Sequence, residues 1–180
     1  MKATGIVRRI DDLGRVVIPK EIRRTMRIRE GDPLEIYTDK EGGVIFKKYS
    51  LMGGLGDFAG QMCETLNKTT GRMAIITDRD TCLAVSGAGK RELTDKRISA
   101  ALEQVMEDRG IYQYQSGQEP LPVSDESSRY FLSCAAPILS EGDLLGCVLF
   151  AGNPEELESS DTEYKLLQTI SGFLGRHMES

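Results

Sequence analysis

The spacing of apolar residues divides the chain into a short β-rich beginning and a longer part with helical stripes. In the first fifty residues, apolar positions alternate or gather in β-branched runs, and Gly14 allows a turn with positive φ. Pro19 suits the first turn of a short helix because its φ is fixed and it lacks an N–H donor. The pattern predicts the order strand, strand, helix, strand, strand, at residues 4–10, 16–18, 19–26, 34–38 and 44–49.

Two consecutive glycines, Gly53 and Gly54, interrupt this pattern and predict a domain boundary, with domains at 1–52 and 53–180. Beyond them, apolar residues at 55–66 and 166–178 recur at helical spacing. A further helix is expected at 95–109, and strands are expected at 73–77, 82–86, 111–115, 130–136 and 144–151, with a hairpin turn between the last two. The second domain should therefore have an α+β fold, an antiparallel sheet flanked by helices.

Charge separates the same two parts. The 180 residues carry a net charge of -5, yet residues 1–50 hold twelve Lys and Arg against eight Asp and Glu. The remaining residues hold 11 basic side chains against 20 acidic ones. A basic segment joined to an acidic body is typical of a protein in which one part contacts nucleic acid.

Fifty residues in this arrangement bury too little apolar surface for a stable monomer. In so small a domain the free energy gained by burial hardly offsets the conformational entropy lost on folding. A second copy that interleaves its hairpins would complete the core and close the exposed sheet edges. It would also place both sets of arginines on one side of a twofold axis. The expected N-terminal fold is thus mainly β, an interleaved dimeric barrel whose geometry suits duplex DNA.

The composition argues against several other classes of protein. No apolar run approaches the roughly 18 residues that a membrane span needs, and no signal-peptide core follows Met1, so a cytoplasmic location without membrane contact is expected. The cysteines lack CxxC spacing and only His177 accompanies them, which indicates buried thiols rather than a metal site or a disulfide framework. We expect no cofactor. The cysteines are Cys63, Cys82, Cys134 and Cys147.

The run from Thr4 to Thr25, continued at 31–36 and 47–49, resembles the swapped-hairpin DNA-binding domain of the AbrB-type transition-state regulators. With its longer C-terminal half, the chain is most similar to sporulation regulators of endospore-forming bacteria. The resemblance implies an obligate homodimer that binds double-stranded, AT-rich and deformable DNA with a loose consensus. The implied DNA-binding residues are Arg8, Arg15, Arg23 and Arg24, with Arg9 and Lys2 as additional phosphate contacts.

Arginine suits this task because its guanidinium gives a phosphate or a guanine edge two parallel hydrogen bonds, whereas lysine offers a point charge. The competing interpretation is that these arginines form an ordinary solvated surface, paired with Asp11, Asp12 and Glu21. The two interpretations differ in whether the guanidinium groups are neutralised within the domain.

The C-terminal half resembles a GAF domain, a small-molecule-sensing module, in the order of its elements and in short fragments such as Thr77–Asp80. In such domains a ligand lies over the sheet, which implies a binding site for an unidentified small molecule at Ser86, Gly87 and Lys90, in the loop of residues 86–96. The alternative is a collapsed pocket in a domain that only pairs subunits. The helices at its two ends commonly bundle with those of a neighbour, which implies a homotetramer.

These features together predict a nucleoid-associated transcriptional regulator, not an enzyme, that activates some late sporulation genes and represses others. One alternative is an antitoxin, because some antitoxins use the same swapped hairpin to bind DNA, but a short disordered tail generally follows it there. Another is a GAF-type methionine sulfoxide reductase using Cys82, Cys134 or Cys147, and a third is a regulator with a cysteine redox switch. A Ser-His-Asp triad built on His177 has no support in the sequence.

Overall fold

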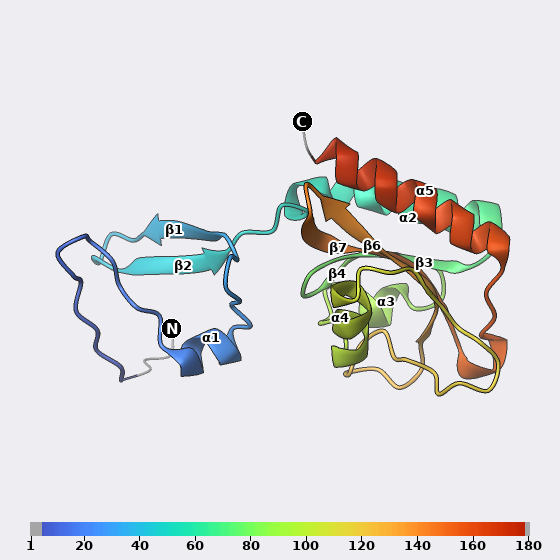
Figure 1. Cartoon of the computed structure of the whole chain (residues 1–180), viewed down its shortest axis with the longest axis horizontal. Coiled ribbons are helices and arrows are strands. Elements are labelled where there is room, and N and C mark those ends of the chain that lie inside the picture. Colours follow the sequence, from blue (N-terminus) through green and yellow to red (C-terminus); the bar gives the residue numbers. More distant parts are fainter. Residues whose placement is uncertain (1–4, 179–180) are drawn as a thin grey trace. The chain divides into compact units, whose positions relative to one another are not determined.

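Two compact units make up the computed structural model, which describes residues 5–178 (Figure 1). The chain divides between Tyr49 and Ser50. We describe each unit by itself.

The N-terminal unit contains one short helix and one hairpin. Helix α1 (Lys20–Thr25) follows Pro19, and strands β1 (Leu34–Thr38) and β2 (Val44–Lys48) pair antiparallel, with Leu34 opposite Lys48. In Figure 1, α1 and the hairpin lie on opposite sides of this unit. The predicted helix and the last two predicted strands of this domain are confirmed.

The other two predicted strands do not form in the single chain. Within residues 5–19 the ordered feature is a turn, in which the Asp11 N–H donates to the Arg15 carbonyl at 3.0 Å and the Gly14 N–H donates to the Asp11 carbonyl at 3.1 Å. The physical reason is that a strand needs a neighbour for its backbone hydrogen bonds. In this unit, β1 and β2 pair only with each other among the described residues.

A five-stranded sheet forms the centre of the C-terminal unit. Its spatial order is β4-β3-β7-β6-β5, and every neighbouring pair is antiparallel. The predicted turn between the last two strands is present at Glu141 and Gly142, both of which have positive φ. The strands are β3 (Met73–Asp78), β4 (Cys82–Ser86), β5 (Tyr112–Gln113), β6 (Phe131–Ser140) and β7 (Asp143–Gly152).

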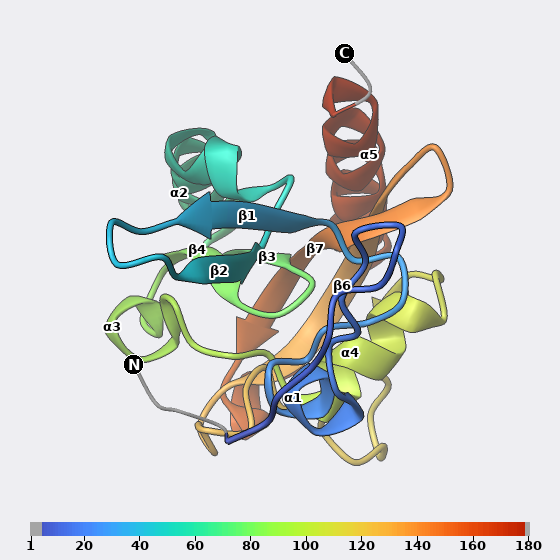
Figure 2. The same ribbon diagram turned by 90° about the vertical axis from the view of Figure 1, so that its left-hand side faces the viewer.

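Helices cover both faces of this sheet, as Figures 1 and 2 show. The long helices α2 (Gly56–Thr70) and α5 (Asp161–His177) pack on one face, with the short helices α3 (Lys90–Leu93) and α4 (Ala100–Glu107) on the other. Alternation along β3 separates the two cores, since Ile75 faces α4 and Ile76 faces α2. The predicted α+β fold of antiparallel sheet and flanking helices is confirmed.

Two single-turn 3-10 helices complete the unit, η1 (Gly53–Leu55) and η2 (Pro154–Glu156). Helix α4 is shorter than the predicted 95–109, because the hydroxyl of Ser99 caps it by accepting from the Leu102 N–H at 2.9 Å. Helix α5 begins with a capping box formed by Ser160 and Glu163.

Candidate nucleic-acid interface

The predicted DNA-binding arginines all lie on the surface of the N-terminal unit. Arg8 and Arg9 lie before the turn, in a segment without helix or strand, and Arg15 ends the turn. Arg23 and Arg24 occupy the last turn of α1. All five side chains are exposed, whereas Lys2 lies outside the described residues.

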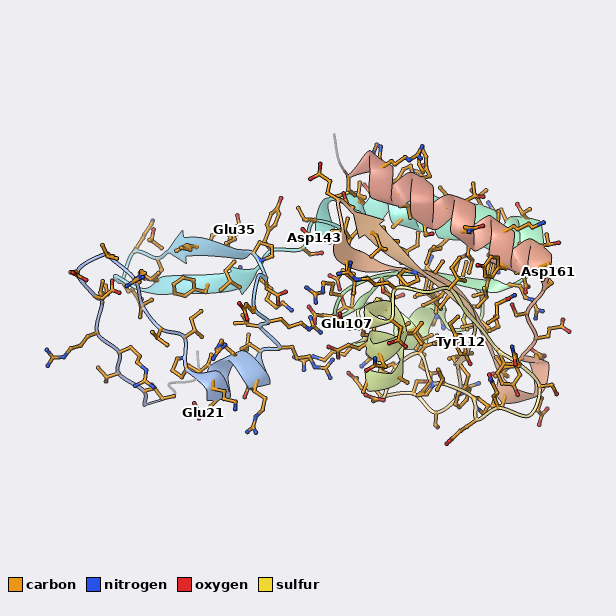
Figure 3. The ribbon with its side chains drawn as sticks, in the orientation of Figure 1. Glu21, Glu35, Glu107, Tyr112, Asp143 and Asp161 are labelled. Atoms are coloured by element: carbon orange, nitrogen blue, oxygen red, sulfur yellow. The ribbon has the colours of Figure 1, made fainter. Side chains whose placement is uncertain are left out.

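Helix α1 presents its two arginines because its opposite side packs inward. Pro19 is buried and Ile22 is half-buried, while the flanking polar residues are exposed. The helix continues from Pro19, whose carbonyl accepts from the Arg23 N–H at 3.0 Å. Glu21, labelled in Figure 3, lies on the same helix. Within residues 5–178 its carboxylate makes no ion pair with either arginine.

Ion pairing distinguishes one arginine from the others. The Arg15 Nε donates to the Asp11 carboxylate at 2.7 Å. Among the described residues, the other four arginines make no such pair, so they are not neutralised within the unit. The competing interpretation of an internally paired surface therefore applies only to Arg15. The four are Arg8, Arg9, Arg23 and Arg24.

The same unit exposes an unusual amount of apolar surface. Val7 is 85% exposed, Ile10 is 71% exposed and Val17 is 69% exposed. The exposed set continues through the hairpin, where half or more of Ile36 and Val44 faces outward. So many exposed apolar side chains on one small unit are typical of a surface that binds a partner.

A shallow cavity of about 150 Å³ lies at one end of the C-terminal sheet. Of the three predicted ligand residues, Gly87 lines it, while Ser86 is buried and Lys90 exposed, and neither is part of the lining. The face of the sheet under α3 is filled by buried Met73 and Leu93. The cavity residues that sequence reasoning missed come from distant elements and share no motif: Asn67, Gly71, Arg72, Met73, Tyr130, Ala151, Gly152, Asn153 and Glu156.

The four cysteines are all buried and unlinked. Burial raises the pKa of the Cys63 and Cys82 thiols to about 12 and that of Cys134 to about 11, and it also raises the pKa of Cys147. A nucleophilic cysteine needs the opposite shift, since the thiolate is the reactive form. Within residues 5–178 no group of three or more His, Cys, Asp or Glu side chains could hold a metal ion.

Three aromatic rings cluster on the outer side of the two long helices. His177 stacks on Phe58 and on Phe173, with ring centroids 5.8 and 5.9 Å apart. Phe173 is 51% exposed although it lies in the middle of a helical stripe. In the part of the chain described here, no helix has both the length and the apolar character that a membrane crossing requires.

The C-terminal unit matches the family described as stage V sporulation protein T C-terminal, transcription factor, over residues 54–179. The whole chain is 46% identical to stage V sporulation protein T of Bacillus subtilis over 179 residues, which is 99% of each chain. The chain belongs to the stage V sporulation protein T family. The predicted function, transcriptional regulation in sporulation, is confirmed in preference to catalysis and to toxin neutralisation.

Further matches concern one unit each. Residues 7–51 match a second family, described as antidote-toxin recognition MazE, bacterial antitoxin. A solved structure of the N-terminal DNA recognition domain of the Bacillus subtilis transition-state regulator AbrB is 64% identical, covering 28% of this chain and 92% of that chain, with a TM-score of 0.24. The AbrB-like character of the N-terminal unit is confirmed by its sequence, which is 65% identical over 49 residues to the transition state regulatory protein AbrB of Bacillus subtilis, covering 27% of this chain and 50% of that protein.

The fold of the C-terminal unit is shared more widely. A type II free methionine-R-sulfoxide reductase from Thermoplasma acidophilum has a TM-score of 0.51 at 13% identity, covering 69% of this chain and 94% of that chain. At that identity the likeness concerns the fold alone. Together with the buried, high-pKa thiols, it leaves the reductase alternative without support in this member of the sporulation protein T family.

Proposed function

We propose that this transcription factor binds AT-rich double-stranded DNA through Arg8, Arg9, Arg15, Arg23 and Arg24, with Lys2 as a further phosphate contact. The observation that carries the proposal is that four of these arginines are exposed and unneutralised on one small, basic unit. The sequence identity with the DNA recognition domain of AbrB supports the same role. Phosphate contacts fix the position of the protein, and the deformability of the site supplies sequence preference.

The binding unit is a homodimer with interleaved hairpins. Its support is the exposed apolar surface of residues 6–17 and of the hairpin, together with the free edges of β1 and β2. A second copy would supply the strand neighbours that residues 5–10 and 16–18 lack in one chain. It would also double the number of arginines presented to one duplex.

The C-terminal units pair these dimers into tetramers through α2 and α5. The exposed rings of Phe173 and His177 against Phe58 support this contact, because aromatic side chains enrich interfaces. When one dimer of such a tetramer is bound to DNA, the other dimer has a raised effective concentration at a neighbouring binding site. The cavity beside Gly87 supports the binding of a small molecule, which could bias DNA affinity if it binds two arrangements unequally. The protein acts on the nucleoid, activating and repressing late sporulation genes.

A salt titration of binding to an AT-rich duplex tests the DNA-binding proposal. Each phosphate contact that is lost should lower the slope of log K against log salt by about 0.9. We compare the wild type with a variant in which four arginines are replaced by alanine, and with a control that removes four exposed cations of the C-terminal unit. The test variant carries changes at Arg8, Arg15, Arg23 and Arg24, and the control carries changes at Arg91, Arg97, Arg109 and Arg129, none of which lies on α2 or α5.

We expect the slope to collapse in the test variant and to stay at the wild-type value in the control. The two variants have the same net charge, so the comparison separates a local DNA-binding surface from bulk charge. Equal slopes in all three proteins would overturn the assignment of these arginines and move the DNA contact elsewhere. Circular dichroism of each variant confirms that a lost slope does not reflect unfolding.

A further inference from the structure

The carboxylate of Asp11 makes three hydrogen bonds within a five-residue turn. Its Oδ1 accepts from the Leu13 N–H at 3.0 Å and from the Arg15 N–H at 2.8 Å. Its Oδ2 accepts from the Arg15 Nε at 2.7 Å. Asp11 therefore holds both the backbone of the turn and the side chain that ends it.

The geometry of the turn depends on Gly14. Its φ is +75°, a conformation that glycine adopts without strain and that brings residue 15 back beside residue 11. All the bonds join residues no more than four positions apart, so they need no contact from elsewhere in the fold. The arrangement is a property of the local sequence and does not depend on a second copy of the chain.

The hydrogen bond from Nε to Asp11 restrains the Arg15 guanidinium at the nitrogen nearest the aliphatic part of the side chain. The two terminal amino groups of Arg15 make no hydrogen bond to Asp11 among the described residues, and the Arg15 side chain is 70% exposed while that of Asp11 is 37% exposed. An arginine restrained in this way loses less rotamer freedom when its outer amino groups bind an anion. Arg8, Arg9, Arg23 and Arg24 have no such restraint among the described residues.

We infer that Asp11 is a positioning residue that preorders Arg15 to receive a DNA phosphate on its two terminal amino groups. The inference rests on the proposed DNA-binding function. It assigns a use to a negative charge in the middle of a basic surface, where a carboxylate by charge alone would weaken DNA binding. Charge and positioning therefore predict opposite effects when Asp11 is neutralised, which makes the inference testable.

The decisive comparison is Asp11→Asn against Asp12→Asn in the full chain. Asparagine keeps a carbonyl oxygen for the two backbone N–H groups of the turn but loses the second acceptor that Arg15 Nε uses. The neighbouring Asp12 carboxylate has no hydrogen-bond partner among residues 5–178, so its replacement changes charge only. Both variants gain one positive unit of net charge.

The probe is an AT-rich duplex oligonucleotide at fixed salt. Positioning predicts that Asp11→Asn binds more weakly than Asp12→Asn by about two- to thirteenfold per protomer engaged, the range expected for immobilising one long side chain. Charge alone predicts equal, slightly tighter binding by both variants, and that result would overturn the inference. Wild-type protein that fails to bind the duplex would refute the DNA-binding proposal itself, so the two failures are distinct.

Lysine variants provide a second measurement, in which Arg15→Lys alone leaves the two backbone hydrogen bonds to Asp11 in place. Lysine at position 15 keeps the charge but lacks Nε and the planar fork, so Arg15→Lys should lose more affinity than Arg8→Lys, which replaces an unrestrained arginine. In an Arg15→Lys background, Asp11→Asn and Asp12→Asn should then bind alike, because the restrained group is gone. Equal losses for Arg15→Lys and Arg8→Lys would contradict the inference even if Asp11→Asn were unfolded.

Discussion

Replacing Ile10 and Val17 by serine tests whether the N-terminal unit is completed by a second copy. In the single chain, 71% of Ile10 and 69% of Val17 is exposed. If one copy were the finished unit, serine would cost almost nothing at either position, because little burial is lost. If hairpins interleave, both side chains become part of a shared core.

The size of the effect follows from the exposed fractions. Full burial of an isoleucine or valine side chain is worth about 1.5–3 kcal/mol, and about seven-tenths of that remains to be gained here. Each serine should therefore cost about 1–2 kcal/mol, and two substitutions in each of two protomers should cost about 4–8 kcal/mol per dimer. That loss is comparable to the whole stability of a small domain.

Amide hydrogen exchange of the full chain measures this loss locally. Exchange of the β1 and β2 amides should accelerate at least about a hundredfold in the double variant, since each 1.4 kcal/mol corresponds to a factor of ten. The amides of β3 in the C-terminal unit serve as an internal reference and should not change. Phe173→Ser is the control, because it removes an exposed apolar side chain from α5 in the other unit. It should leave the exchange of the β1 and β2 amides unchanged.

Unchanged exchange of β1 and β2 in the serine variant would refute the reasoning. It would mean that the exposed apolar surface of residues 6–17 is not covered in solution. Altered exchange of β3 together with unchanged exchange of β1 and β2 would refute it equally. Because the readout is local, association of the C-terminal units does not interfere with it.

Three further outcomes are expected in the C-terminal unit. Gly175→Ala should destabilise it by about 1–3 kcal/mol in urea unfolding, because the new Cβ would meet the Leu139 backbone oxygen, whereas Gly172→Ala on the same helix has open space and should stabilise it by about 0.5–1 kcal/mol. Arg72→Met should cost about 2–3 kcal/mol in the same assay, since the buried Glu163 loses its 2.7 Å partner; an unchanged midpoint would contradict this. Burial raises the pKa of Cys134 to about 11 from an ordinary value near 9, so iodoacetamide at pH 8 should leave the native thiol unlabelled. Burial raises the pKa of all four thiols, so their joint contribution to stability is complete below pH 9 and is lost as the pH rises through the raised pKa values. The Tm should therefore be lower at pH 10 than at pH 8.

Secondary structure in the C-terminal unit followed closely from the sequence. The strands β3 and β4 and the helices α2 and α5 appear within a few residues of the predicted positions, because their apolar patterns are long and each ends at a glycine, a turn or a cap. The boundary of α4 was less predictable. The helix begins after Ser99 because the Ser99 side chain caps it there, whereas the sequence pattern had predicted a start at residue 95.

The residues that we propose to bind DNA or a ligand also differ in how far the sequence predicted them. The arginines were identified from charge and motif, and their exposure on α1 and the turn follows from local pattern. The cavity was predicted only at Gly87 and Ala88 in the loop of residues 86–96, because its other walls combine the end of α2, the start of β3 and the end of β7. The filling of the sheet face by Met73 likewise depends on packing between distant elements.

By itself, the sequence determined the features that act over a few residues: the basic and acidic halves, the α1 helix, the hairpin of β1 and β2, and the Asp11–Arg15 turn with its glycine. Only the tertiary structure decided which side chains meet across the sheet, how deeply the cysteines are buried, and that residues 5–19 form no strand within one chain. The physical reason is range. Turns, caps and periodicity depend on neighbours in sequence, whereas strand pairing, burial and cavities depend on partners brought together by the fold or by a second chain.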